Sequence, residues 1–201
     1  ERFVALTLTD ISNQKRMERE LELRRRELET VAATDELTRV LNRRGAVSLL
    51  EENLGRFERY GRRFSVVLLD IDRFNAVNDT YGHDVGDRVL RNVAEILSHV
   101  SRETDHVARW GGEEFVVICA ESGVDAGVRF AQRAQRVLTS FSHAIGEEAS
   151  NDPGFVVTAS FGVNKVKKGD TLDSVVRRAD EAMYTAKKQG RNQICVHSSE
   201  S

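Results

Sequence analysis

The sequence predicts an α/β (α+β) fold in which a mixed central sheet of about five strands has helices packed around it and a helical stalk before it. Two observations favour this fold. Apolar, strand-like runs alternate with segments of helical periodicity from residue 35 onward, and two of these runs lie close enough to form a hairpin. Residues 11–34 contain neither Gly nor Pro and are dense in Glu, Arg and Leu, which is typical of a continuous helix.

The N-terminal segment is predicted to contain one strand followed by the stalk. Residues 3–10, FVALTLTD, alternate two sets of side chains and are rich in β-branched residues, so we expect a strand left over from an upstream domain. Positions at alternating spacings of three and four form a heptad seam: Gln14, Met17, Leu21, Arg24, Leu28 and Val31. The seam predicts a two-stranded parallel coiled coil; the alternative is a single solvated amphipathic helix.

From residue 35 onward the sequence predicts the bounds of each helix and strand. Asp35 to Tyr60 is expected to form a helix capped by Thr34 or Asp35 and ended by Gly61. The remaining strands are expected within 64–72, 107–120 (two strands and a tight turn), 154–167 and 193–197, and the remaining helices within 84–100, 124–142 and 171–189. Residues 143–153 are expected to form a polar loop.

Composition excludes several classes of function. The chain has 201 residues, a formal net charge of −2 and a pI of about 6.3, so we expect no nucleic-acid polymer as a partner. Its longest apolar runs are too short to span a bilayer. Cys119 and Cys195 lie in apolar runs and are interpreted as buried, reduced thiols of a cytoplasmic protein. Because the chain starts with Glu and shows no signal peptide, we expect a piece of a longer protein.

Two acids end the first buried strand. Asp70 and Asp72 are two residues apart, so both would project from the same face of the strand. There they could offer hard oxygen ligands to Mg²⁺ at the rim of the sheet. The alternative is a solvated strand end whose acids cap the next turn.

A glycine pair and a glutamate pair form the hairpin turn. Gly111 and Gly112 permit positive φ and let backbone N–H groups approach phosphate oxygens, although such pairs also occur in plain turns. Glu113 and Glu114 repel each other unless a cation lies between them or they face opposite ways. If the hairpin lies beside the strand that bears Asp70, several carboxylates converge, which suits metal-dependent phosphoryl or nucleotidyl transfer.

Four ordered motifs resemble those of the GGDEF family of diguanylate cyclases. RWGGEEFVVI (109–118) resembles the family signature in its GGEEF form, and the others are DELTRVLNRRG (35–45), LDIDRFNAVNDTYGHDVGD (69–87) and ADEAMYTAKKQGRN (179–192). The resemblance covers residues 35–197. It implies a nucleotidyl-cyclase or palm-like fold, and condensation of two GTP molecules into cyclic di-GMP with release of two pyrophosphates.

The resemblance also assigns roles to residues. It implies that Mg²⁺ or Mn²⁺, two ions per active site, is bound by Asp70, the Ile71 carbonyl, Glu113 and Glu114, of which Glu113 and Glu114 are also catalytic. The implied substrate-binding residues are Phe74, Asn75, Asn78, His83, Asp87, Gly111, Gly112, Lys187 and Arg191. Asn78 and Asp87 would read the guanine edge, and Lys187 and Arg191 would contact phosphates. Taken alone, these four would be a turn residue, a helix-proximal acid and solvated charges at a helix C-terminus.

One position departs from the family pattern. Asn75 stands where the family often has Lys, which removes a positive charge from the expected phosphate site. Arg73 could compensate only if its side chain points the same way. The departure bears on phosphate affinity and not on the reaction itself.

A second ligand site is implied upstream of the turn. Arg102 and Asp105 form an RxxD sequence at the family's offset from Gly111, where the resemblance implies inhibition by bound cyclic di-GMP. Arginine can grip a phosphate and stack on guanine, and aspartate can accept from the guanine edge. Arg133 or Arg136 is expected to supply a second contact.

The predicted domains are 1–10, the remnant of an upstream PAS-like sensor; 11–34, a coiled-coil signalling helix; and 35–198, the catalytic domain. Because cyclic di-GMP is two-fold symmetric and each domain holds one GTP, a homodimer is expected, and the stalk would raise the local concentration of domains. The alternatives are a non-catalytic GGDEF receptor for GTP or cyclic di-GMP, a coiled-coil adaptor, and a class III nucleotidyl cyclase, although such cyclases lack the GGEEF turn.

Overall fold

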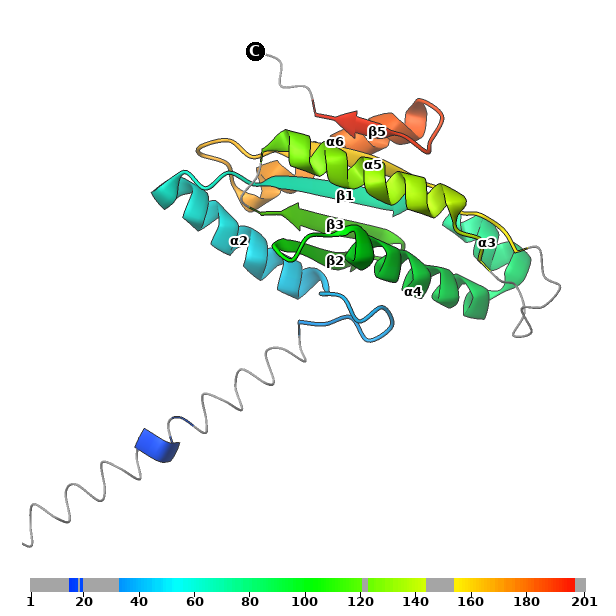
Figure 1. Cartoon of the computed structure of the whole chain (residues 1–201), viewed down its shortest axis with the longest axis horizontal. Coiled ribbons are helices and arrows are strands. Elements are labelled where there is room, and N and C mark those ends of the chain that lie inside the picture. Colours follow the sequence, from blue (N-terminus) through cyan, green and yellow to red (C-terminus); the bar gives the residue numbers. More distant parts are fainter. Residues whose placement is uncertain (1–14, 18, 20–32, 121–122, 144–153, 198–201) are drawn as a thin grey trace, which may run out of the picture.

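The computed structural model describes residues 15–17, 19, 33–120, 123–143 and 154–197 (Figure 1). Residues 15–17 and 19 are helical, in agreement with the helix predicted over 11–34. The strand predicted at 3–10 and most of the stalk lie outside the described residues, so the coiled coil and the upstream domain stay predictions.

The described strands form one mixed, five-stranded sheet, as predicted. They are β1 (Ser65–Ile71), β2 (Asp105–Gly111), β3 (Glu114–Cys119), β4 (Ala159–Lys165) and β5 (Ile194–Val196), in the order β2-β3-β1-β4-β5. β1 pairs antiparallel with both β3 and β4, whereas β5 pairs parallel with β4. Every residue of β1 is buried, because this strand lies at the centre of the sheet between two layers of helices.

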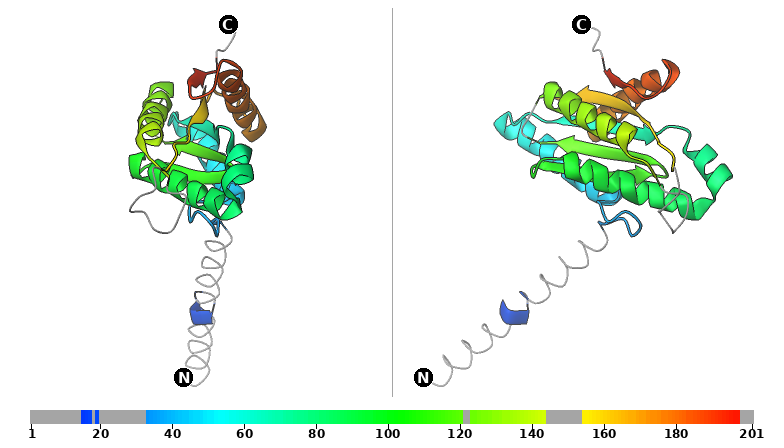
Figure 2. Two further views of the ribbon diagram at one scale, coloured as in Figure 1. Left: turned by 90° about the vertical axis from the view of Figure 1, so that its right-hand side faces the viewer. Right: turned by 45° about the vertical axis from the view of Figure 1, so that its right-hand side comes forward.

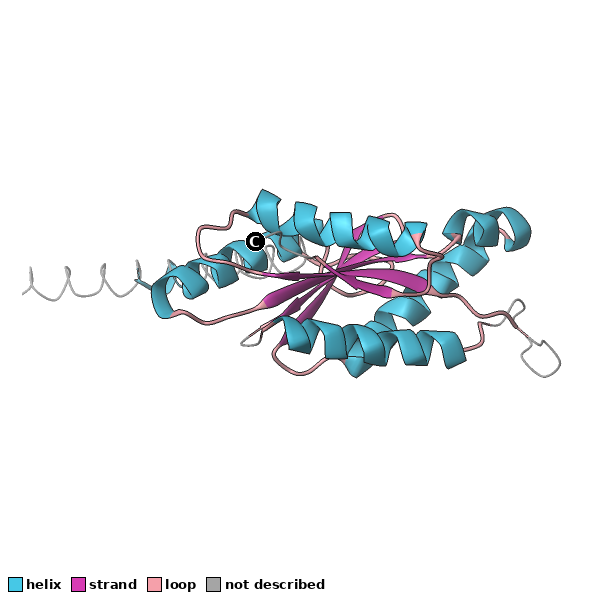
Figure 3. Cartoon of the chain, turned by 90° about the horizontal axis from the view of Figure 1, so that it is seen from above, coloured by secondary structure: helices cyan, strands magenta, loops and turns pink. Residues whose placement is uncertain are grey.

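Helices cover both faces of the sheet (Figures 2 and 3). They are α2 (Arg43–Tyr60), α3 (Phe74–Tyr81), α4 (His83–Val100), α5 (Val124–Ser140) and α6 (Leu172–Lys188). The buried side chains of α4 and α5 pack with one face of the strands, and those of α2 and α6 pack with the other. α3 lies at the end of the sheet toward which β1 runs (Figure 1).

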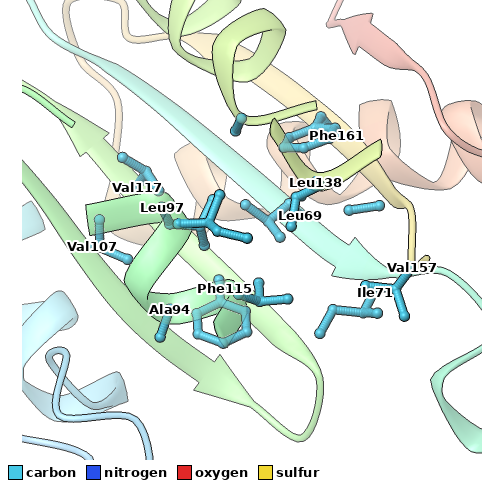
Figure 4. Close-up of a cluster of buried hydrophobic side chains, with 14 of the residues drawn as sticks. Leu69, Ile71, Ala94, Leu97, Val107, Phe115, Val117, Leu138, Val157 and Phe161 are labelled. Atoms are coloured by element: carbon cyan, nitrogen blue, oxygen red, sulfur yellow. The ribbon is translucent and has the colours of Figure 1, made fainter. Parts of the chain in front are cut away.

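Alternation along β1 decides which of its side chains faces which helices. Leu69 and Ile71 belong to the core between the sheet and α4 and α5, together with Phe115 of β3 (Figure 4). Leu68 belongs to the core beneath α2 and α6. Because successive strand residues point to opposite faces, Asp70 is directed toward α6.

The chain before α2 differs from the prediction. Helix α2 begins at Arg43, and Asn42 is its N-cap, with a side-chain oxygen 3.0 Å from the Gly45 nitrogen. Residues 33–42, termed the lead-in segment below, form a turn in which Asp35 accepts hydrogen bonds from the N–H and the hydroxyl of Thr38. The predicted helix start at Asp35 and the cap at Thr34 or Asp35 are therefore wrong, because the Asp35 carboxylate closes a turn instead of opening a helix.

Helix α3 is a second difference, because the sequence pattern predicts no helix there. Its eight residues bury only Phe74 and Val77, which is too little periodicity to indicate a helix. Gly82 ends α3 with a φ of 85° and directly precedes α4. A positive φ at this position favours glycine, and it lets the two helices follow each other without a loop.

No helix in the described ranges is long and apolar enough to cross a bilayer.

The two cysteines differ in how deeply they are buried. Cys119 is buried as expected, but Cys195 is only partly buried. Burial raises the pKa of the Cys119 thiol to about 12, so this thiol stays protonated and unreactive.

A buried histidine, His143, is expected to make the stability of the fold depend on pH. His143 is 1% exposed, and its Nε2 has no hydrogen-bond partner among the described residues. Burial lowers the pKa of His143 from 6.5 to about 4, so between these values the folded ring stays neutral while the unfolded ring is protonated. We therefore expect the free energy of unfolding to fall, by up to about 3 kcal/mol, as the pH drops through this window.

Urea unfolding curves measured from pH 7 down to about pH 4 test this expectation. A His143→Gln variant has no titratable ring at this position and should lose less stability over the same range. Equal losses in the two proteins would contradict the assignment of the effect to His143.

Candidate active site

The acids that the sequence predicts to converge lie on neighbouring strands. Asp70 stands directly opposite Glu114 in the β1–β3 ladder, and the Ile71 N–H donates to the Glu113 carbonyl at 3.4 Å. In Figure 1, β1 runs toward α3 and β3 runs away from it, so the end of β1 and the turn before β3 share one edge of the sheet. The fold therefore brings Asp70 beside the glutamate pair, as expected.

A lysine supplies positive charge to this group of acids. Lys187 on α6 forms an ion pair with Asp70, with 2.7 Å between Nζ and Oδ2. Burial raises the pKa of Asp70, and the negative charge of Glu113 adds to this rise while Lys187 opposes it. Burial also raises the pKa of Glu114, with a further contribution from the charge of Asp70. The acids thus lie close enough to repel one another, and Lys187 offsets part of that repulsion.

The side chains at this edge suit a divalent cation. Asp70, Glu113 and Glu114 offer carboxylate oxygens, which are the ligands that Mg²⁺ and Mn²⁺ prefer. Within the described ranges, no three side chains of ligand type form a ready-made cage. Magnesium is usually held by one or two carboxylates together with substrate phosphates, so no such cage is required. The donors therefore fit a cation that arrives with a nucleoside triphosphate.

The second acid at the strand end has different partners. Asp72 accepts hydrogen bonds from the hydroxyls of Thr158 and Ser160, at 2.6 and 2.7 Å, and from the Asn192 N–H at 3.0 Å. Asp70 instead meets the Lys187 ammonium group. The structure thus separates two acids that the sequence pattern treats alike.

A second group of predicted residues gathers where α3 meets α4. A Cβ added to Gly86 would lie 1.9 Å from the Asn78 side-chain oxygen and 3.3 Å from Phe74 Cζ, so the Asn78 side chain rests against the backbone of α4. Asp87 is the next residue of that helix. Among the predicted substrate-binding residues of this region, Phe74 is buried, Asn78 and Asp87 are half-buried, and Asn75 and His83 are exposed.

Arg109, to which the sequence pattern assigns no role, holds the glycine turn. Its Nε donates to the Gly112 carbonyl at 2.9 Å, and its Nη1 lies 3.3 Å from each carboxylate oxygen of Asp35. Burial would raise the pKa of Asp35, but hydrogen bonds from Thr38 and the charge of Arg109 lower it below its usual value. The only sequence signal for this contact is an arginine near the glycine pair, and no spacing rule links it to an acid so far upstream.

The lead-in segment also pairs with β2 through its backbone. The Leu41 N–H donates to the Val107 carbonyl at 3.2 Å, and the Arg109 N–H donates to the Leu41 carbonyl at 2.7 Å. The Arg43 guanidinium lies 4.7 Å from the centre of the Trp110 ring, a cation–π distance. The two residues before the glycine pair are therefore both held by the chain that enters the domain.

The predicted phosphate contacts differ in their surroundings. Lys187, near the end of α6, points into the acid group through Asp70, whereas Arg191 is exposed in the turn that follows this helix. Arg191 has a φ of 64°. Together with Asp72 and Arg73 it lines a pocket of about 390 Å³ between α3 and this turn.

The predicted product site lies at the other end of the hairpin from the glycine turn. β2 separates the two by about 20 Å, at about 3.4 Å per residue. The Arg102 N–H donates to the Asp105 carboxylate at 3.0 Å, and the Asp105 N–H donates to the Arg102 carbonyl at 2.9 Å, so the RxxD sequence closes a turn. The Arg102 side chain is exposed. Of the two candidate partners, Arg133 donates twice to the Val100 carbonyl near this turn, whereas Arg136 bonds within its own helix.

The fold and this arrangement of acids define the class of the protein. The family model described as "Diguanylate cyclase, GGDEF domain" matches residues 32–193, and the chain belongs to this family. The response regulator PleD of Caulobacter vibrioides is 40% identical over 167 residues, covering 82% of this chain and 36% of PleD. The diguanylate cyclase DgcM of Escherichia coli K12 is 33% identical over 194 residues, covering 96% of this chain and 44% of DgcM. The chain thus spans less than half the length of these relatives.

Solved structures have the same architecture. The diguanylate cyclase SiaD of Pseudomonas aeruginosa, crystallised with its activator SiaC, has a TM-score of 0.79 at 33% identity over 94% of this chain and 70% of that chain. The coiled coil and GGDEF domain of DgcB from Caulobacter crescentus, in complex with c-di-GMP, has a TM-score of 0.78 at 29% identity over 98% of this chain and 100% of that chain. The predicted family and fold class are therefore confirmed, and the residue roles stay predictions.

Proposed function

We propose that this chain is the catalytic part of a diguanylate cyclase that condenses two GTP molecules into cyclic di-GMP. The observation that carries the proposal is the position of Asp70 opposite Glu114, at the sheet edge beside the glycine turn. Carboxylates at such an edge suit metal-dependent nucleotidyl transfer. Because Asp70 and both glutamates are present, catalysis is favoured over a receptor role.

In this proposal α3 and α4 select the base. Asp87 accepts hydrogen bonds from N1–H and the exocyclic amine of guanine, and Asn78 bonds the same base from α3. Phe74 is buried with its ring close to Gly86 of α4, and His83, at the start of α4, would contact the sugar or the phosphates. Adenine does not present this pair of donors, so GTP is preferred over ATP.

Cationic side chains and backbone N–H groups bind the triphosphate. Lys187 and Arg191 neutralise its charge, while N–H groups at the start of α3 and at the glycine turn approach its oxygens. Asn75 adds no charge there. Bound Mg²⁺ or Mn²⁺, two ions per site held by Asp70, the Ile71 carbonyl and the two glutamates, would stabilise the charge that develops as pyrophosphate leaves.

The reaction consists of two transfers of the same kind. The 3′-oxygen of one GTP bonds to the α-phosphorus of the other, the bond from that phosphorus to the bridging oxygen breaks, and pyrophosphate leaves. The second transfer closes the ring with the two nucleotides in exchanged roles. Each attack releases the proton of a 3′-hydroxyl to a carboxylate of the glutamate pair.

The reaction needs two domains, because each holds one GTP. We therefore propose a homodimer in which the coiled coil at 11–34 holds two catalytic domains, residues 35–198, near each other. An upstream sensor of PAS type would change how the coiled coil orients them. A cytoplasmic location follows from the substrate, since GTP is an intracellular nucleotide.

Incubation of the chain with GTP and Mg²⁺, followed by chromatography of the nucleotides, tests the proposed reaction. We expect one cyclic di-GMP and two pyrophosphates for every two GTP consumed. A Glu113→Gln/Glu114→Gln variant should keep its fold by circular dichroism and form product at least about 100-fold more slowly. If the unaltered dimer binds GTP or cyclic di-GMP but forms no product, the receptor function replaces the proposed one.

Product inhibition through the RxxD turn gives a separate prediction. Arg102→Ala keeps the backbone N–H that donates to Asp105, so the turn should survive while the exposed guanidinium is lost. We expect calorimetry to show cyclic di-GMP affinity reduced by about tenfold or more, together with weaker product inhibition. An unchanged affinity for cyclic di-GMP would refute this role of Arg102.

A further inference from the structure

Asp72 connects three segments at the active-site end of the sheet. It directly follows β1, is 8% exposed, and accepts hydrogen bonds from the Thr158 and Ser160 hydroxyls of the β4 side of the sheet. Its third bond comes from the backbone N–H of Asn192, in the turn after α6. A buried carboxylate that accepts three hydrogen bonds holds the donor groups firmly in place, because hydrogen bonds to charged groups are stronger than those between neutral groups.

The turn that Asp72 holds has an unusual backbone. Arg191 and Asn192 have φ values of 64° and 46°, so two successive residues with side chains occupy the left-handed region. Such conformations cost free energy and persist only where surrounding contacts impose them. The contacts here are the bond from the Arg191 N–H to the Ala186 carbonyl, the bond from Asn192 to Asp72, and a bond from the Gln135 side chain to the Asn192 carbonyl.

Asp70 and Asp72 therefore contact neighbouring parts of the segment that carries Lys187 and Arg191. Asp70 pairs with Lys187 near the end of α6, and Asp72 binds the turn that carries Arg191. Asp72 and Arg191 also line the same pocket of about 390 Å³. Their spacing in the sequence makes Asp70 and Asp72 both candidates for metal binding. The hydrogen-bond partners of Asp72, however, are two hydroxyl groups and one backbone N–H.

We propose that Asp72 is a positioning residue for the triphosphate: it fixes the turn of residues 190–192 so that Arg191 faces the terminal phosphates. This inference rests on the proposed function, because it takes GTP as the substrate. Asp72 does not touch the nucleotide in this account. Its effect reaches the substrate through Asn192 and Arg191.

Nucleotide binding by an Asp72→Asn variant tests the proposal. The amide keeps the shape of the side chain but loses the charge and one acceptor, so the turn loosens. We expect the affinity for GTP to fall about tenfold, while the affinity for GMP, which lacks the two terminal phosphates, stays the same. Asp125→Asn, which removes an exposed acid in the first turn of α5, is the matched control and should change neither affinity.

A double-mutant cycle with Arg191→Ala shows whether Asp72 acts through Arg191. In the Arg191→Ala background, Asp72→Asn should add little further loss of GTP affinity, because the two residues act in series. Additive losses would overturn the proposal, and so would equal losses for GTP and GMP. A loss of Mn²⁺ affinity without nucleotide would also overturn it, since it would make Asp72 a metal ligand.

A second variant tests the turn without altering Asp72. Gln135→Ala removes the bond from the Gln135 side chain to the Asn192 carbonyl, so it should reduce the affinity for GTP but not for GMP, even if Asp72→Asn fails to fold. If Gln135→Ala causes no such selective loss, the result contradicts the proposal. If the unaltered protein neither binds GTP nor forms cyclic di-GMP, the proposed function fails. If it does both and Arg191→Ala weakens GTP binding while Asp72→Asn does not, only the role of Asp72 fails.

Discussion

Asp70→Asn should lower the rate of cyclic di-GMP formation at least about 100-fold, because in the proposed reaction this carboxylate would help to hold the cation that offsets the developing charge. Asp70 is buried, lies opposite Glu114 and pairs with Lys187 at 2.7 Å. The amide occupies nearly the same volume, so the effect should come from lost charge and not from altered packing. Rates of pyrophosphate release with Mg²⁺ and with Mn²⁺ measure it.

Metal-free GTP binding separates this role from general damage to the site. Without divalent cations, Asp70→Asn should bind GTP at least as well as the unaltered protein, because it removes a negative charge from beside Lys187. Asp125→Asn carries the same change of charge at an exposed position and should leave the rate unchanged. An Asp70→Asn enzyme that retains more than about a tenth of the normal rate would contradict a metal-binding role.

Gly86→Ala should weaken GTP binding strongly, by about tenfold or more, although it adds only one methyl group. The new Cβ would lie 1.9 Å from the Asn78 side-chain oxygen and 3.3 Å from Phe74 Cζ. Because the nearest atom is at the end of a side chain, the fold can accommodate the methyl group by moving Asn78 away from the base. We therefore expect a raised KM for GTP, poorer discrimination against ATP and a smaller change in kcat.

Two other glycines provide controls for this substitution. Gly55→Ala lies in α2, where an added Cβ meets nothing within 4 Å, so it should leave GTP binding unchanged and stabilise the helix by up to about 1 kcal/mol. Gly127→Ala crowds Ser65 and Val163 at 2.9 Å, at the end of β1 opposite to Asp70, and should reduce thermal stability without a selective effect on KM. If Gly86→Ala behaves like either control, Asn78 does not read the base.

The sheet could be predicted from the sequence because its strands are apolar runs with clear boundaries. β1 is buried along its whole length and stands out as SVVLLDI, and the glycine pair marks the turn between β2 and β3. The longer helices have strong periodicity. Helix α3 does not, since a helix of eight residues that buries only Phe74 and Val77 carries almost no periodic signal.

The start of α2 was mispredicted because its upstream residues imitate a helix. Leu37, Val40 and Leu41 have helical spacing, yet they pack as part of a turn, and Asp35 and Asn42 use their side chains to bond the backbone locally. Short polar side chains of this kind compete with helix formation, which a count of apolar spacings does not register.

Within the site, the sequence could indicate which residue types converge but not how they are partnered. Asp70 and Asp72 have equal standing in the sequence, and only the three-dimensional contacts give one to Lys187 and the other to Asn192. The link from Asp35 through Arg109 to Gly112 joins positions too distant for any spacing rule. Such partners depend on tertiary packing and therefore require the fold.

Chimeric proteins that join a foreign sensor to this domain should have their junction upstream of Ala33 and not at the start of α2. A junction at Arg43 would delete Asp35 and Leu41, leaving the Arg109 guanidinium without its carboxylate and the outer edge of β2 without backbone partners. Unpaired edges of this kind invite aggregation. A fusion library that varies linker length should therefore insert or remove residues before position 33. It should keep the lead-in segment intact, since this segment supports the β2–β3 hairpin from outside the sheet.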